Sequence, residues 1–166
     1  LMVNLKKLFG KTCPMDFTFG IITGADWKDN NERAINEIID SIEIQCIPNY
    51  EVLIVGPFNT VRDKTTVIEF DEDQKFAWIT RKRNIIAEQA AFENIVFMCD
   101  YVKLLDGWYE GYLTYGNEFK ICMNPILNTD NTRFRDWLLW DPPIQGMKKE
   151  EKLLPYDRTH LSQWMY

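Results

Sequence analysis

One carboxylate, Asp100, directly follows the apolar run Ile95-Val96-Phe97-Met98-Cys99. Such a run is typical of a strand buried in a sheet, so we expect Asp100 to lie where that strand ends. A carboxylate there can bind a divalent cation and bridge it to phosphate oxygens of a ligand. The alternative is that Asp100 caps the following turn, and a single carboxylate is compatible with both roles.

Three basic residues and an amide stand together in Arg81-Lys82-Arg83-Asn84. They fall at the start of an expected helix over 80–91, where the positive end of the helix dipole adds to their charge. Guanidinium and ammonium groups in this position can hold a pyrophosphate. The alternative is a solvated helix start without a ligand.

A third candidate mixes guanidinium groups with flat aromatic side chains in Arg133-Phe134-Arg135-Asp136-Trp137-Leu138-Leu139-Trp140. This composition suits stacking on sugar rings or bases, although Trp137 and Trp140 can equally pack in the core. His160 is the sole histidine, so a multi-histidine zinc site is excluded, and we interpret it as a surface or helix-end residue.

Several common motifs are absent. The chain has neither G-x-x-x-x-G-K-[ST] nor G-x-G-x-x-G, which argues against a P-loop nucleoside triphosphatase and an ordinary dinucleotide-binding protein. No C-x-x-C pair occurs among Cys13, Cys46, Cys99 and Cys122, so a reduced, cytoplasmic location is expected.

The first half of the chain alternates strand and helix signals. We expect a buried strand over 17–23, a turn at Gly24-Ala25-Asp26, and a helix that begins near Asp29 or Asn30. The helix carries an apolar stripe at helical spacing, formed by Ala34, Ile35, Ile38, Ile39 and Ile42. A second buried strand over 52–55 ends at Gly56-Pro57, and the intervening helix makes it parallel to the first.

The next segments continue this pattern. A weaker strand over 65–70, an acidic turn at 71–73, a helix over 80–91 and a strand over 95–99 complete a β-α-β-β-α-β order. The helix is expected to turn Ile86, Ala87 and Ala90 inward. Beyond it we expect a helix over 108–115, a strand over 119–123, a turn over 128–131, loop from 141 onward and a short helix from about residue 159.

This order predicts an α/β fold, a mostly parallel sheet flanked by helices in three layers. Ligands bind such sheets at the carboxyl ends of the strands, where helix N-termini offer free N–H groups. The candidate positions are therefore Thr23 to Asp26, Gly56 to Asn59, and Asp100.

The 166 residues are enough for one domain that buries roughly 70% of its unfolded surface, so a single domain over 1–166 is expected. The net charge of −6 disfavours nucleic acid as a partner. No apolar run approaches the length of about 20 residues that a transmembrane helix needs. The chain begins with Leu1 and stops at Tyr166 after Trp164-Met165, so we expect a fragment of a longer protein.

The chain resembles the family 2 type of glycosyltransferase with a GT-A fold, which binds nucleotide-diphospho-sugars in a Rossmann-like sheet. The strand Phe19 to Thr23 and the helix from Glu32-Arg33-Ala34-Ile35 to Ser41-Ile42 are similar to that family's opening strand and its E-R-A-L…S-I helix. Val52 to Val55 is similar to its second strand. The most specific likeness joins the segment from Thr80 to Ala90 with Ile95 to Asp100, which resembles S-x-x-R-N-x-G…A…Y-I-x-F-L-D-x-D.

Downstream segments resemble a subgroup in which His-Asp-Tyr replaces the acidic metal motif. They are Gly107-Trp108-Tyr109-Glu110-Gly111, Arg133 to Trp137, and Leu154-Pro155-Tyr156-Asp157. The corresponding motif in this chain is Cys99-Asp100-Tyr101.

The resemblance implies a nucleotide-sugar site. It places Thr23 and Ala25 beside the nucleoside base, adds Gly24 and Gly56 to the residues that bind the nucleotide-sugar, brings Arg83 to the nucleotide, and makes Asp100 the ligand of Mg²⁺ or Mn²⁺ on the diphosphate. The implied partners are a nucleotide-diphospho-sugar donor and a carbohydrate, lipid-linked or protein acceptor. The family's acceptor-binding half is expected to lie beyond residue 166.

Two positions depart from the family pattern. Gly56-Pro57-Phe58 stands where the family has an acidic pair that holds the nucleoside, and Asp100 is alone where the family has Asp-x-Asp. These departures leave a second interpretation open, a nucleotide-binding or scaffold domain without catalysis. Another α/β enzyme, such as a methyltransferase, is disfavoured because only Gly24 follows the first strand, where such an enzyme needs a glycine-rich turn.

Overall fold

The structure is a computed structural model that describes residues 14–24, 31–73, 75, 78–115, 120–134, 138–140 and 151–153. The chain divides into two compact units, Leu1–Glu118 and Phe119–Tyr166, and each is treated by itself below. A single domain over 1–166 stays a prediction. No helix in the described ranges has both the length and the apolar character needed to cross a membrane.

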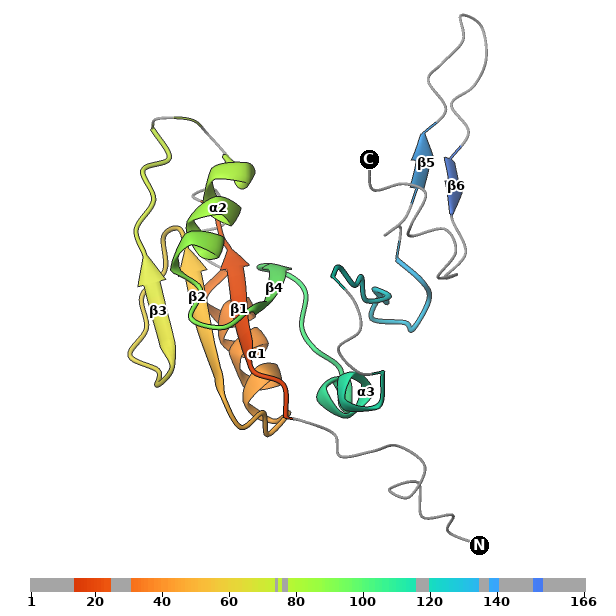
Figure 1. Cartoon of the computed structure of the whole chain (residues 1–166). Coiled ribbons are helices and arrows are strands. Elements are labelled where there is room, and N and C mark those ends of the chain that lie inside the picture. The colour runs from red at the N-terminus through yellow and green to blue at the C-terminus, as the bar shows by residue number, and fades with distance from the viewer. Residues whose placement is uncertain are drawn as a thin grey trace, which may run out of the picture. The chain divides into compact units, whose positions relative to one another are not determined.

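The first unit is built on a four-stranded parallel sheet with the order β3-β2-β1-β4 (Figure 1). Its strands are β1 (Phe17–Ile22), β2 (Tyr50–Val55), β3 (Thr65–Ile68) and β4 (Asn94–Cys99). Its helices are α1 (Asn31–Glu43), α2 (Ile79–Gln89) and α3 (Trp108–Tyr115). The predicted β-α-β-β-α-β order and the parallel pairing of the first two strands are confirmed.

The two inner strands form the centre of the core. From Val52 to Val55 every side chain of β2 is almost fully buried, as expected for a strand covered on both faces. On β1, Phe17, Phe19 and Ile21 point to one face, while Thr18 and Gly20 point to the other.

Helix α1 covers one face of the sheet, and Figure 1 shows α2 on the other. The predicted apolar stripe of α1 is confirmed, since Ile35, Ile38, Ile39 and Ile42 are all buried. Three layers, helix on sheet on helix, follow from this arrangement. The fold is therefore α/β, as predicted.

On α2, Ile86 packs against Leu53 and Val55 of the sheet. The helix approaches β1 closely at Gly20, where an added Cβ would lie 2.4 Å from Cγ2 of Ile86. The prediction that Ala87 points inward is wrong, because Ala87 is exposed while Ile85 packs against the core. Residues 82, 85 and 86 form the inner face, which is the spacing of a helix.

An aromatic cluster joins α3 to the same face as α1. The ring of Phe17 lies 5.1 Å from that of Trp108, 6.2 Å from that of Tyr109 and 5.7 Å from that of Tyr112. Gln45, just after α1, accepts a hydrogen bond from the backbone N–H of Tyr109 at 3.2 Å. These contacts fix the segment that follows β4 against the core.

Strand β4 is less buried than its apolar sequence predicts. Phe97 is 45% exposed, and only Met98 of this strand is buried. The reason is position, because β4 ends the strand order among the described residues and has one strand neighbour there. Apolar composition alone does not distinguish an inner strand from an outer one.

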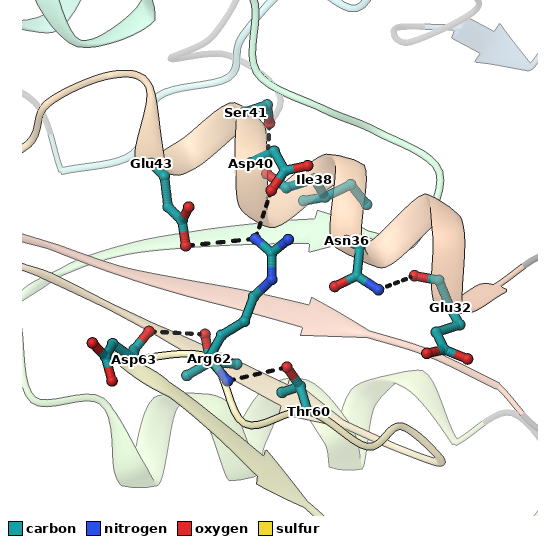
Figure 2. A network of polar contacts seen from close by, with 10 residues as sticks. Glu32, Asn36, Ile38, Asp40, Ser41, Glu43, Thr60, Arg62 and Asp63 are labelled. Atoms are coloured by element: carbon teal, nitrogen blue, oxygen red, sulfur yellow. Dashed lines mark hydrogen bonds and ion pairs between the residues drawn. The ribbon is translucent and has the colours of Figure 1, made fainter.

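Arg62 ties the connection between β2 and β3 to α1 (Figure 2). Its guanidinium lies 2.6 Å from the carboxylate of Asp40 and 3.5 Å from that of Glu43, both near the end of α1. The N–H of Val52 in β2 donates to the carbonyl of Lys64, two residues after Arg62. The Arg62 contacts therefore lie toward the edge where the strands begin.

In the second unit, β5 (Leu138–Trp140) and β6 (Glu151–Leu153) pair antiparallel. The turn predicted over 128–131 is confirmed by the N–H of Asn131 donating to the carbonyl of Asn128. The strand predicted over 119–123 is wrong for 120–123, which have no strand partner, and residue 119 lies outside the described residues. The loop predicted from 141 onward is wrong at 151–153, because β6 depends on a partner that is distant in the sequence.

Candidate functional site

Three of the predicted site residues lie along one edge of the sheet. Ile22 of β1 is level with Val55 of β2 and with Cys99 of β4. The next residues along the chain, Thr23, Gly56 and Asp100, therefore follow the carboxyl ends of three strands, with Thr23 on the central one. In a parallel sheet this is the edge at which ligands bind.

At Gly56 the ends of β1 and β2 come close together. The backbone N–H of Thr23 donates to the carbonyl of Val55 at 3.1 Å. Gly56 has a φ of +133°, and an added Cβ would lie 2.4 Å from the Thr23 carbonyl oxygen. Glycine is required here because a side chain would separate the two strand ends.

A buried lysine occupies the same edge. The Lys82 ammonium donates to the Thr23 carbonyl at 2.6 Å and forms a short ion pair with the Glu72 carboxylate. It also lies 4.9 Å from the centre of the Phe70 ring. Lys82 is only 1% exposed, so α2, the end of β1 and the segment after β3 meet around one charge.

This arrangement corrects the interpretation of Arg81-Lys82-Arg83 as one phosphate-binding cluster. Lys82 points into the core, and Arg81 pairs with Glu88 at 3.1 Å on the exposed surface of α2. A cation that already has a carboxylate partner is less available to a phosphate. Of the three basic residues, Arg83 remains the candidate for binding an anion.

Arg83 extends from α2 over β4. Its guanidinium carbon lies 6.0 Å from the centre of the Phe97 ring, a cation–π contact. Within the described ranges Arg83 forms no ion pair, and Phe97 lies on β4, three residues before Asp100. The structure thus brings Arg83 to the strand that Asp100 ends.

Asp100 is partly exposed and begins the turn after β4. The residues before and after it, Cys99 and Tyr101, interact with each other. A hydrogen bond with the Cys99 thiol is the main cause that raises the pKa of Tyr101 above 10.0. The negative charges of Cys99 and Asp100 raise this pKa further, because they disfavour a phenolate. Asp100 therefore stands between a thiol and a phenol that stays protonated at neutral pH.

The donor set at Asp100 suits a cation that is shared with a ligand. The described residues contain no group of three or more histidine, cysteine or carboxylate side chains that could hold a metal by themselves. Mg²⁺ is commonly bound through one or two carboxylates together with phosphate oxygens and water. Asp100 fits this mode of binding, in which the phosphates of the ligand complete the coordination.

Some predicted residues lie outside the described residues. These are Ala25, the helix-capping candidates Asp29 and Asn30, Trp137 and His160, and for Trp140 only the backbone is described. Gly24 is described, and an added Cβ there would meet no atom within 4 Å.

Sequence reasoning missed Glu72 and the burial of Lys82. The sequence shows Glu72 only as part of an acidic turn and Lys82 only as part of a basic cluster. The available signal is helical spacing, since Lys82 precedes Ile85 and Ile86 by three and four residues and so falls on the apolar face. A lysine on an apolar face requires a buried partner, and the acidic turn supplies one.

Comparisons with known proteins give one fold likeness. No family model matches the chain, and no curated protein matches it. The chain is similar to the crystal structure of residues 1–349 of TarS from S. aureus, with 19% identity and a TM-score of 0.45. The likeness covers 58% of this chain and 31% of that one, so the chain spans about a third of the TarS structure.

Proposed function

We propose that the chain is the donor-binding part of a glycosyltransferase, which holds a nucleotide-diphospho-sugar at the carboxyl edge of its sheet. One observation carries the proposal: Thr23, Gly56 and Asp100 follow the ends of three parallel strands, and Arg83 lies over the strand that Asp100 ends. The proposal therefore rests on this chain's own residues.

In the proposed reaction an acceptor hydroxyl displaces the nucleoside diphosphate from the anomeric carbon of the sugar. The Arg83 guanidinium stabilises the negative charge that develops on the departing diphosphate. Thr23 and Gly24 border the nucleoside, and the close approach of Gly56 to Thr23 holds the Thr23 backbone in position.

Asp100 would hold a divalent cation, Mg²⁺ or Mn²⁺, against the diphosphate. When bound, such a cation supplies Lewis-acid stabilisation of the leaving group. Asp100 begins the turn after β4, in which the N–H of Val102 donates to the carbonyl of Cys99.

A second candidate is a nucleotide-binding or scaffold domain that does not catalyse transfer. The observation that favours it is the donor set, since Asp100 is the one carboxylate in the described segment 99–101. Without a second hard oxygen ligand from the protein, binding of a nucleotide without a cation becomes the simpler arrangement.

Titration with uridine and guanosine diphosphates, with and without Mn²⁺, tests the proposal by calorimetry. We expect one of them to bind more tightly with Mn²⁺, and Asp100→Asn to abolish the Mn²⁺ effect. Arg83→Gln should weaken binding by about 10- to 150-fold, since losing a hydrogen bond to a charged group costs about 1.5–3 kcal/mol. The matched control Arg81→Gln removes a neighbouring guanidinium that pairs with Glu88 and should bind like the unaltered chain.

The outcomes separate the two candidates. Cation-independent binding that Asp100→Asn leaves unchanged favours the scaffold domain, and absence of binding to either diphosphate contradicts the donor site. Hydrolysis of a panel of nucleotide sugars then identifies the donor. Hydrolysis that is unaffected by Asp100→Asn would remove Asp100 from the site.

A further inference from the structure

Lys82 is the one charged side chain among the described residues that is fully buried. Its ammonium donates to the Thr23 carbonyl, pairs with the Glu72 carboxylate and lies over the Phe70 ring. The Glu72 side chain is itself only 13% exposed. The pair is therefore largely removed from water.

Folding stability alone gives little reason for a buried ion pair at this place. Removing two charges from water costs free energy that their attraction only partly repays. Apolar residues of similar volume at the two positions are often as stable or more stable. A buried pair can instead select one arrangement of the segments that it joins.

The segments joined by Lys82 are those that border the proposed donor site. Thr23 follows the central strand β1, and its carbonyl also limits the space at Gly56. Glu72 and Phe70 belong to the connection that leads from β3 to α2. Lys82 lies in the first turns of α2, one residue before Arg83. One ammonium group thus fixes the end of β1, the connection after β3 and the start of the helix that carries Arg83.

We propose that Lys82 is a positioning residue of the nucleotide site, acting through Thr23 and Glu72 without contact to the ligand. This inference rests on the proposed function. The Lys82–Glu72 pair sets the position of the Thr23 backbone, which borders the nucleoside, and the rotation of α2, which aims Arg83 at the diphosphate. Small displacements of groups that hold a ligand cause large losses in binding or rate.

The test compares Lys82→Met, Glu72→Met and the double variant with the unaltered chain. Urea unfolding gives the stability of each variant. Calorimetry gives its affinity for uridine and guanosine diphosphates in the presence of Mn²⁺. Each single variant leaves one buried group without its partner and should be destabilised. The double variant replaces both members by apolar side chains and should regain the stability of the unaltered chain.

Binding should behave differently from stability. We expect the double variant to bind the diphosphate at least about 10-fold more weakly although it is folded. The conservative Glu72→Gln variant keeps an oxygen that accepts from Lys82 and should bind within about 3-fold of the unaltered chain. Arg62→Met, which removes an ion pair toward the opposite edge of the sheet (Figure 2), is the matched control and should not change the affinity.

Two results overturn the inference. A double variant that binds as tightly as the unaltered chain shows that the pair serves only the fold, and Glu72→Gln with as large a loss as Glu72→Met shows that the hydrogen bond from Lys82 is not the cause. A chain that binds neither diphosphate before any substitution contradicts the proposed function itself, which distinguishes that failure from this one.

Discussion

Lys82 and Arg83 are adjacent in the chain, yet one is buried and the other is exposed. Each step along a helix rotates the side chain by about 100°, so neighbours face different surroundings. Lys82 faces the sheet and forms an ion pair with Glu72, whereas Arg83 lies over the exposed ring of Phe97. The position of each residue around the axis of α2, more than its charge, therefore determines whether its side chain is buried or exposed.

Tyr101 provides a test at the scale of a single residue. The residue is 71% exposed, and the pKa of its phenol is raised chiefly by the hydrogen bond with Cys99. We expect Cys99→Ala to lower the Tyr101 pKa toward 10.0, because both the hydrogen bond and the thiolate charge are lost. Nuclear magnetic resonance of ring-labelled tyrosine measures the titration, and Tyr101→Phe assigns the signal. A pKa that is unchanged in Cys99→Ala would place the cause elsewhere.

At the scale of elements, the contact of α2 with the sheet depends on one glycine. Gly20 lets Ile86 approach β1, and an added Cβ would lie 2.4 Å from Cγ2 of Ile86. Helix α2 carries both Lys82 and Arg83, so its distance from the sheet sets the position of both. Packing in the core is thereby linked to the geometry of the candidate site.

Gly20→Ala should lower the free energy of unfolding by about 1–3 kcal/mol, as overpacking does in other cores. Ile86→Ala should lower it by about 2–5 kcal/mol through the cavity that it leaves. The double variant should cost less than the sum, because the shorter side chain makes room for the new methyl group. Urea unfolding monitored by circular dichroism measures all three variants.

Gly111→Ala is the control for this series. Gly111 lies in α3, and an added Cβ there would meet no atom within 4 Å. Alanine should raise the stability by up to about 1 kcal/mol because it favours helix formation. Costs in the Gly20 series that simply add would contradict a direct contact between residues 20 and 86.

At the scale of the molecule, all four strands of the parallel sheet and the helices on both of its faces belong to the unit Leu1–Glu118. The second unit, Phe119–Tyr166, has its own antiparallel pair of strands. The proposed donor site uses residues of the first unit only.

A chain of residues 1–118 should therefore fold by itself, since a domain with its own core can do so. We expect a single cooperative unfolding transition in urea, and diphosphate binding within about 3-fold of that of the whole chain. Circular dichroism and calorimetry provide the two measurements. Non-cooperative unfolding of residues 1–118 would show that the second unit is needed for the fold.

Much of the fold was predictable because its signals are local. Runs such as Val52 to Val55 identify inner strands, and the isoleucine stripe of α1 identifies a helix with one buried face. The candidate site follows from the same sequence patterns in part, since the rule that ligands meet the ends of parallel strands selects Thr23, Gly56 and Asp100. The pairing of β5 with β6 was not predictable, because three-residue strands carry little periodicity and their pairing spans distant residues.

The sequence by itself determined the order of strands and helices over residues 17–115, the parallel pairing of β1 with β2 and the edge at which the candidate site residues lie, because hydrophobic periodicity depends on neighbouring residues. Only the tertiary structure decided that Lys82 is buried against Glu72, that Gly56 must be glycine, and that β4 lies at the end of the strand order. In each case the interacting groups are far apart in the sequence. Tertiary packing, and not local propensity, brings them together.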